Sequence, residues 1–202
     1  NEVGQIVSKG PKLGQVTDQS VEILDECEWR KPGQSPVMTD TRKFTVHVVD
    51  GRRRWIDAEL RWTAVTDVTI EKTNHSLFSV RAAPDLTPKA GGKLENSFGK
   101  MGEKATFGEP AGWCTYYNKR PGVPGDGIEG IALLNHPTNP WKDCRWFTRD
   151  YGFISPTPFN FLDKPWKLAA GKSVDLRYRV VAYAGTPTDA DLEWIYKAWI
   201  RQ

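Results

Sequence analysis

The chain has 202 residues, a net charge of +3 and 39% hydrophobic residues, which is enough for one β domain with its own core. Nine tryptophans add to the apolar area that the domain can bury. Lysine and arginine are spread along the chain without a basic stripe, and no window approaches the ~18 uninterrupted apolar residues of a membrane helix. We therefore expect no nucleic-acid partner and no membrane span.

Apolar and polar residues alternate with a period of two along most of the chain, which predicts antiparallel strands with one buried face. Two strands are expected early, at residues 5–7 and 15–28. A hairpin follows, with strands at residues 43–49 and 55–65 and a turn at Asp50-Gly51, where a positive φ would make a β-branched residue unfavourable. Further strands are expected at residues 68–72, 77–82, 113–117, 130–135, 146–154 and 174–183.

Two long segments, residues 84–112 and 119–127, are rich in glycine and proline and are expected to be loops. One helix is expected at the C-terminus, with Thr186 as its N-cap and Pro187 as its first residue. Its apolar stripe should pack against the strands and consists of Leu192, Ile195, Tyr196 and Trp199.

These elements predict an all-β fold, a single antiparallel β-sandwich domain over residues 1–202 with one C-terminal α-helix. The three cysteines have neither the number of a disulfide framework nor the spacing of zinc ligands. The sequence contains no P-loop, no GxSxG, no HExxH and no GxGxxG followed by a helix. We expect no metal and no cofactor. The compartment is left open, with a secreted or periplasmic location as the working expectation.

Polar residues that could carry chemistry follow two of the predicted strands. His136 and Asn139 come after an apolar strand, and Arg149 and Tyr151 lie in an aromatic one. A histidine can act as an acid or base near neutral pH, and arginine and asparagine can hold hydroxyls or a carboxylate. The structural alternative is that His136 only shapes a turn and that Arg149 only forms an ion pair with Asp150.

A second group combines Arg81, late in a strand, with Asn96 in the glycine-rich segment that follows. Asn74 and His75 flank the preceding turn. A surface ion pair for Arg81 and Asx turns for the two asparagines are the structural alternatives.

Four segments occur in an order that resembles a known family: HSLFSVRAAP (75–84), GGKLENSFGKMGEKATFGEPAGWCTYY (91–117), GIALLNHPTNP (130–140) and RWFTRDYGFISPTPFNF (145–161). From about Thr41 onward the chain resembles the DUF6807 family, and its HPxNP and RDYG elements are the most specific. The resemblance implies a galactose-mutarotase-like β-sandwich whose members accompany sugar utilisation. The label "methane oxygenase" that the family often carries does not fit, because that copper enzyme is an integral membrane protein.

The chain departs from the family pattern in two ways. Phe147 stands where the family commonly has a histidine. Family members also usually carry a histidine-rich segment before the point where this chain begins, so the chain looks like the C-terminal two thirds of such a protein. Missing N-terminal strands would expose sheet edges, and association with that segment or with a second copy would cover them.

Two hypotheses follow, both with a carbohydrate as partner. In the first, the protein is a sugar lyase, epimerase or other isomerase, or hydrolase that binds its substrate on the concave sheet face, with His136 and Arg149 as catalytic residues. The expected substrate-binding residues converge on that surface and are Arg81, Asn96, Trp113, Asn139 and Tyr151. The alternative is a non-catalytic carbohydrate-binding or assembly module.

Overall fold

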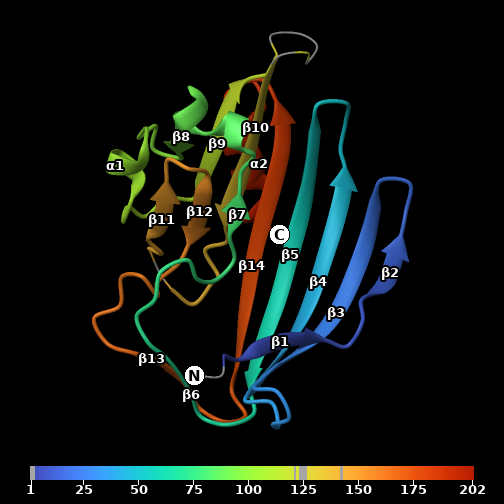
Figure 1. Ribbon diagram of the computed structural model, residues 1–202. Helices are drawn as coiled ribbons and strands as arrows, with labels where there is room; N and C mark the ends of the chain where they lie inside the picture. The colour runs from blue at the N-terminus through green and yellow to red at the C-terminus, as the bar shows by residue number, and fades with distance from the viewer. Residues whose placement is uncertain (1–2, 121, 123–126, 142) are drawn as a thin grey trace.

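The computed structural model describes residues 3–120, 122, 127–141 and 143–202. In this part of the chain, nine antiparallel strands form one large sheet in the order β1-β3-β4-β5-β14-β10-β9-β8, with β2 also paired to β3 (Figure 1). These strands are β1 (Gln5–Ser8), β2 (Lys12–Val16), β3 (Ser20–Arg30), β4 (Met38–Val48), β5 (Arg53–Ala64), β8 (Lys93–Asn96), β9 (Trp113–Lys119), β10 (Ile128–Asn135) and β14 (Ser173–Ala184).

Two smaller sheets lie on one face of the large sheet, and the C-terminal helix lies on the other (Figure 1). The smaller sheets contain β7 (Val80–Arg81), β11 (Trp146–Arg149) and β12 (Phe153–Pro156), and β6 (Val68–Ile70) with β13 (Trp166–Leu168). The helices are η1 (Pro84–Leu86), η2 (Pro88–Ala90), α1 (Glu103–Thr106) and α2 (Leu192–Trp199). The predicted fold class is confirmed: antiparallel sheets in a sandwich-like arrangement, with a short C-terminal helix. Among the described residues, no helix combines the length and the apolar character needed to cross a membrane.

Successive side chains of the long strands point to opposite faces of the large sheet, so the core forms two clusters, one on each face. The cluster beneath the smaller sheets includes Tyr116, Leu133, Trp146, Ile154, Leu176 and Tyr178. The cluster beneath α2 includes Trp113, Leu134, Val181, Leu192, Ile195 and Trp199. Each large side chain contributes about 1.5–3 kcal/mol when it is fully buried, so both faces of the sheet stabilise the fold.

The predicted hairpin is present, with β4 and β5 paired up to Val48 and Arg54 and a turn at Asp50-Gly51. The expected reason for the turn was wrong, because Gly51 does not have a positive φ. Instead, the Asp50 carboxylate accepts the backbone N–H groups of Arg52 and Arg53, both at 2.7 Å, and the guanidinium of Arg53 at 2.7 Å. An aspartate side chain therefore closes this turn.

We expect Asp50→Ala to lower Tm at pH 7, whereas Gly51→Val should leave Tm almost unchanged. Hydrogen bonds from Arg52 and Arg53 lower the pKa of Asp50. Its stabilising contribution is thus present above the unfolded-state pKa of about 3.9 and is lost as the pH falls through the lower folded-state value. Thermal unfolding followed by circular dichroism between pH 7 and pH 2 should show the Asp50→Ala deficit disappear in acid. A larger loss for Gly51→Val would contradict this account.

Two predicted strands are interrupted in the structure. Residues 146–154 form a hairpin of β11 and β12 rather than one strand, because Gly152 has a φ of 101° and turns the chain after Tyr151. Of residues 77–82, only Val80–Arg81 is a strand, since His75 and Leu77 have left-handed φ values of 49° and 69°.

Other boundaries also differ from the prediction. The expected strand at 15–28 is divided between β2 and β3, and the expected loop at 84–112 contains η1, η2, β8 and α1. The expected loop at 119–127 lies largely outside the described residues. The three cysteines, Cys27, Cys114 and Cys144, are all buried and free.

The C-terminal helix begins later than predicted. Thr186 does donate its backbone N–H and its hydroxyl to Asp189 Oδ2, but this contact closes a separate turn. Asp191, with a φ of 53°, separates that turn from α2. The predicted packing of the helix is confirmed, since Leu192 and Trp199 are no more than 2% exposed.

Candidate functional site

His136, the expected acid–base residue, is buried where β10 ends and lies beneath α2. Its Nδ1 lies 2.7 Å from Thr138 Oγ1, its Nε2 lies 3.3 Å from the Arg177 guanidinium, and its ring meets Trp199 edge-on. Nδ1 also accepts the backbone N–H of Thr138 at 3.2 Å, so both ring nitrogens of His136 have partners within the protein. Burial, with the charges of Arg177 and Arg179, lowers the pKa of His136 to about 4. A neutral, fully engaged imidazole suits a structural role.

Three of the expected sugar-binding residues also have local partners. Asn139 pairs with the backbone of Arg177 on β14, accepting its N–H at 2.7 Å and donating to its carbonyl at 3.0 Å. Trp113 is buried beneath α2 and donates its indole N–H to Glu193 at 3.0 Å. The side-chain carbonyl oxygen of Asn96 accepts the backbone N–H groups of residues 98 and 100, which closes the turn after β8. These contacts hold the sheet, the helix and a turn in place.

Arg81, Arg149 and Tyr151 do come together, on the outer face of the three-stranded sheet. Phe153 pairs in register with Arg149 on one side and with Arg81 on the other, and paired residues point to the same face. The Arg81 guanidinium lies over the Tyr151 ring, 4.8 Å from its centroid. The large sheet separates this group from His136 beneath α2 (Figure 1), so the expected site residues do not share one surface.

Arg149 forms an ion pair with Glu103 of α1 rather than with Asp150. Its guanidinium lies 2.7 Å from Glu103 Oε1 and stacks between Phe107 and Phe147, at 4.6 Å and 4.3 Å from their centroids. Asp150 accepts the backbone N–H of Glu103 at 3.0 Å and donates its own N–H to Glu103 Oε2 at 2.8 Å. Both residues therefore attach the β11–β12 turn to α1.

His75 is the member of this surface that sequence reasoning missed. Its Nε2 lies 2.6 Å from the Tyr151 hydroxyl, and its ring packs against Phe147 and Phe153 at 4.8 Å and 4.9 Å. The left-handed backbone at His75 and Leu77 costs about 1–3 kcal/mol each, and such strain is concentrated at functional sites. The local sequence indicated only a turn, because the partner of His75 is 76 residues away.

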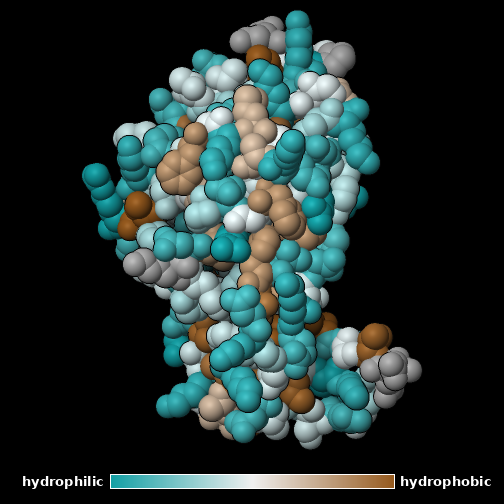
Figure 2. All heavy atoms as spheres, turned by 90° about the vertical axis from the view of Figure 1, so that its left-hand side faces the viewer, coloured by the Kyte–Doolittle hydropathy of each residue, from teal (hydrophilic) through white to brown (hydrophobic). Residues whose placement is uncertain are grey.

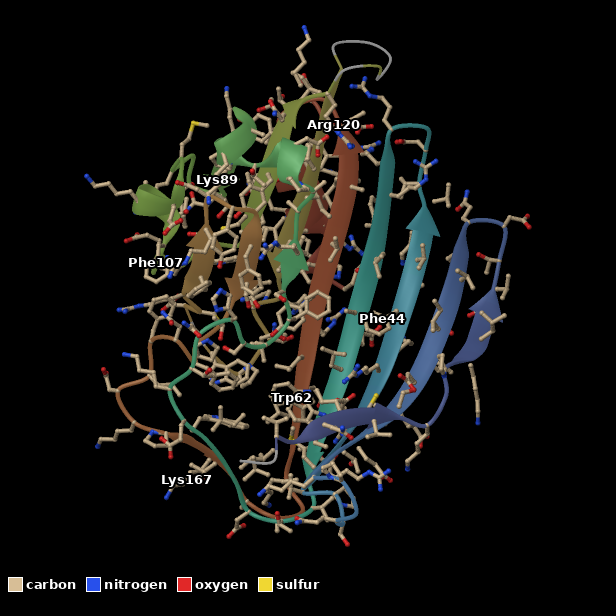
Figure 3. The ribbon with its side chains drawn as sticks, in the orientation of Figure 1. Phe44, Trp62, Lys89, Phe107, Arg120 and Lys167 are labelled. Atoms are coloured by element: carbon tan, nitrogen blue, oxygen red, sulfur yellow. The ribbon has the colours of Figure 1, made fainter. Side chains whose placement is uncertain are left out.

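A cleft of about 660 Å³ lies on the same face of the large sheet, between β3–β5 and residues 71–79, here called the 71–79 loop. Figure 3 labels Phe44 and Trp62 on this face. Its aromatic lining consists of Trp29, Phe44, Trp62, Phe78 and Phe159. Its polar lining includes Arg42, Thr69, Glu71, Thr73 and Ser76. Mostly apolar walls with a few polar groups, at this volume, are typical of ligand sites.

Arg42 is positioned at the cleft by a buried carboxylate. Asp40, which is 1% exposed, accepts the Trp29 indole N–H at 2.5 Å and two guanidinium N–H groups of Arg42 at 2.5 Å and 2.8 Å. Within the part of the chain that the structure describes, Nη1 of Arg42 donates to no protein acceptor. The guanidinium can therefore donate to a ligand while Asp40 holds it in a fixed orientation.

A family model described as a family of unknown function, DUF6807, matches residues 1–197. The chain belongs to the DUF6807 family. The match includes β1, β2 and β3, so it extends further toward the N-terminus than the resemblance from Thr41 onward. No curated protein matches this DUF6807 chain. Across its described residues, no three or more His, Cys, Asp and Glu side chains gather as metal ligands would.

Proposed function

We propose that this DUF6807 protein binds a carbohydrate in the cleft on the open face of its large sheet. The observation that carries the proposal is the lining, in which five aromatic side chains lie beside a guanidinium, a carboxylate and hydroxyls. Aromatic rings pack against the apolar face of a sugar ring, and the polar groups exchange hydrogen bonds with its hydroxyls. The galactose-mutarotase-like β-sandwich that the resemblance implies is part of this proposal.

The side chains at the cleft fit the binding of a sugar better than its enzymatic conversion. Glycoside hydrolysis generally requires two carboxyl groups on either side of the scissile bond. Glu71 is the carboxylate in the lining of the cleft, and Asp40, which positions Arg42 there, is engaged by Trp29 and Arg42. The expected acid–base residue, His136, is neutral and lies beneath α2. Of the two hypotheses, the contacts therefore favour a non-catalytic carbohydrate-binding protein.

The test is a titration of the protein with mono- and disaccharides, including uronic acids, followed by tryptophan fluorescence and calorimetry. Trp29 and Trp62 line the cleft, so a bound sugar should change their emission saturably. Phe44→Ala removes one aromatic wall and should weaken binding by roughly tenfold or more, since a large buried ring contributes about 1.5–3 kcal/mol.

Phe98→Ala is the matched control for Phe44→Ala, because Phe98 is 71% exposed and does not line the cleft. It should leave the affinity unchanged. The proposal fails if no sugar binds saturably, or if the Phe44 and Phe98 variants bind equally well.

A further inference from the structure

Outside the cleft, on the outer face of the three-stranded sheet, four polar side chains gather at the surface. We call them the outer cluster: His75, Arg81, Lys89 and Tyr151. The first three are exposed and Tyr151 is half-buried. Figure 3 labels Lys89 on the side of the molecule that carries β7 and β11, and Figure 2, which looks at this side, shows a mostly hydrophilic surface crossed by a narrow apolar band.

Two cations from different elements converge on one phenol ring. Cζ of Arg81, on β7, lies 4.8 Å from the centroid of the Tyr151 ring. Nζ of Lys89, on η2, lies 5.8 Å from the same centroid. In the described residues, neither cation forms an ion pair with a carboxylate, whereas the neighbouring Arg149 is paired with Glu103. Their shared ring places both positive charges on one patch of the surface, and an anion bound there would offset their mutual repulsion.

The Tyr151 hydroxyl is held in place by a hydrogen bond with His75. The Tyr151 oxygen and His75 Nε2 lie 2.6 Å apart, and the tautomer of His75 decides which of them donates. When Nε2 carries the hydrogen, His75 donates and the hydroxyl hydrogen is free for an external acceptor. The ring of His75 is fixed by Phe147 and Phe153, so the hydroxyl is oriented before any ligand arrives.

The backbone around the outer cluster is built to hold this geometry. Gly152, with a φ of 101°, follows Tyr151, and a Cβ there would lie 2.8 Å from Thr87 Cγ2. Ser155 Oγ lies 2.8 Å and 2.9 Å from the carbonyl oxygens of residues 76 and 78, which share its single hydroxyl hydrogen, and this contact attaches the strained segment to β12. Strain that is maintained by surrounding contacts is a mark of pre-organised sites.

We propose that the outer cluster binds a small oxyanion, the carboxylate or phosphate group of a ligand. Arg81 and Lys89 supply the positive charge, and the Tyr151 hydroxyl supplies an oriented donor. The evidence for this site is separate from that for the carbohydrate cleft, which lies on the other side of the 71–79 loop.

Imidazole NMR provides a direct test, because the chain has three histidines. Inorganic phosphate and acetate are titrated separately into the full chain at constant pH, with sodium chloride at equal ionic strength as reference. Each anion should shift the His75 signal saturably, and the tighter of the two identifies the preferred group. The signals of His47 and buried His136 should not move. Shifts that chloride reproduces would overturn the proposal.

Three variants separate binding from folding. Arg81→Gln/Lys89→Gln should abolish saturation, and Tyr151→Phe should weaken binding roughly tenfold or more, as loss of a charged hydrogen bond predicts. Lys12→Gln/Lys167→Gln removes the same charge at two exposed sites elsewhere and should bind as wild type. Unchanged His47 and His136 signals report that each variant is folded. Retained binding in the Arg81/Lys89 variant would refute the assignment.

Discussion

Replacing Trp199 with alanine is expected to lower the free energy of unfolding by about 3–5 kcal/mol, the usual cost of truncating a core tryptophan. The side chain is 2% exposed beneath α2. Its ring meets His136 edge-on at 4.8 Å and lies 5.3 Å from the guanidinium of Arg179. Truncation leaves a cavity between α2 and the large sheet, and it also removes the wall against which His136 is held.

Trp194 on the same helix provides the matched control, because its side chain is 63% exposed. Trp194→Ala should change the unfolding free energy by no more than about 0.5 kcal/mol. Urea unfolding followed by circular dichroism measures both variants without relying on tryptophan emission. Equal midpoints for the two variants would show that α2 is not docked through Trp199.

Asp40→Ala should be the second large loss, at about 3 kcal/mol or more, because removing one partner of a buried ion pair leaves the other uncompensated. The variant removes the acceptor of the Arg42 guanidinium and of the Trp29 indole N–H, and both groups lose these hydrogen bonds beside the cleft. Asp40→Asn keeps the shape and one acceptor oxygen, so it should lose less.

Asp175→Ala is the control for Asp40→Ala within the same sheet. Asp175 pairs with Arg61 at 3.2 Å, but both side chains are more than half exposed, and such pairs contribute about 0–1 kcal/mol. Urea unfolding at pH 7 compares the two variants. A loss at Asp40 no greater than that at Asp175 would mean that the buried network is not a stabilising feature.

The parts of the fold that were predictable are those in which local pattern and tertiary structure agree. Residues 55–65 alternate cleanly because β5 is half-buried in the large sheet, and the stripe of α2 is apolar because it faces that sheet. Residues 77–82 have an equally good strand pattern, yet only Val80–Arg81 is a strand. Leu77 has a left-handed backbone that no local preference predicts, and the carbonyls on either side of it contact Ser155, far along the chain.

The site was predicted less well than the fold for a related reason. A histidine followed by proline after a strand fits both a catalytic loop and a turn, and only the contacts of His136 with Arg177 and Trp199 distinguish them. Within RDYG, the sequence pointed to Arg149 and Tyr151, and the structure places them on the same face of the three-stranded sheet as Arg81. It could not supply the partner of Tyr151, because His75 reaches it from the distant loop between β6 and β7.

The 71–79 loop has one side on the carbohydrate cleft and the other on the outer cluster. Ser76 and Phe78 line the cleft, while His75 between β6 and β7 reaches Tyr151. The segment is short and is attached to β12 through Ser155, so a displacement of its backbone would be expected to reach both sites. If an anion at the outer cluster changes sugar affinity by some factor, the sugar must change the anion's affinity by that same factor. The two sites would then act as a thermodynamically coupled pair, joined through nine residues of backbone.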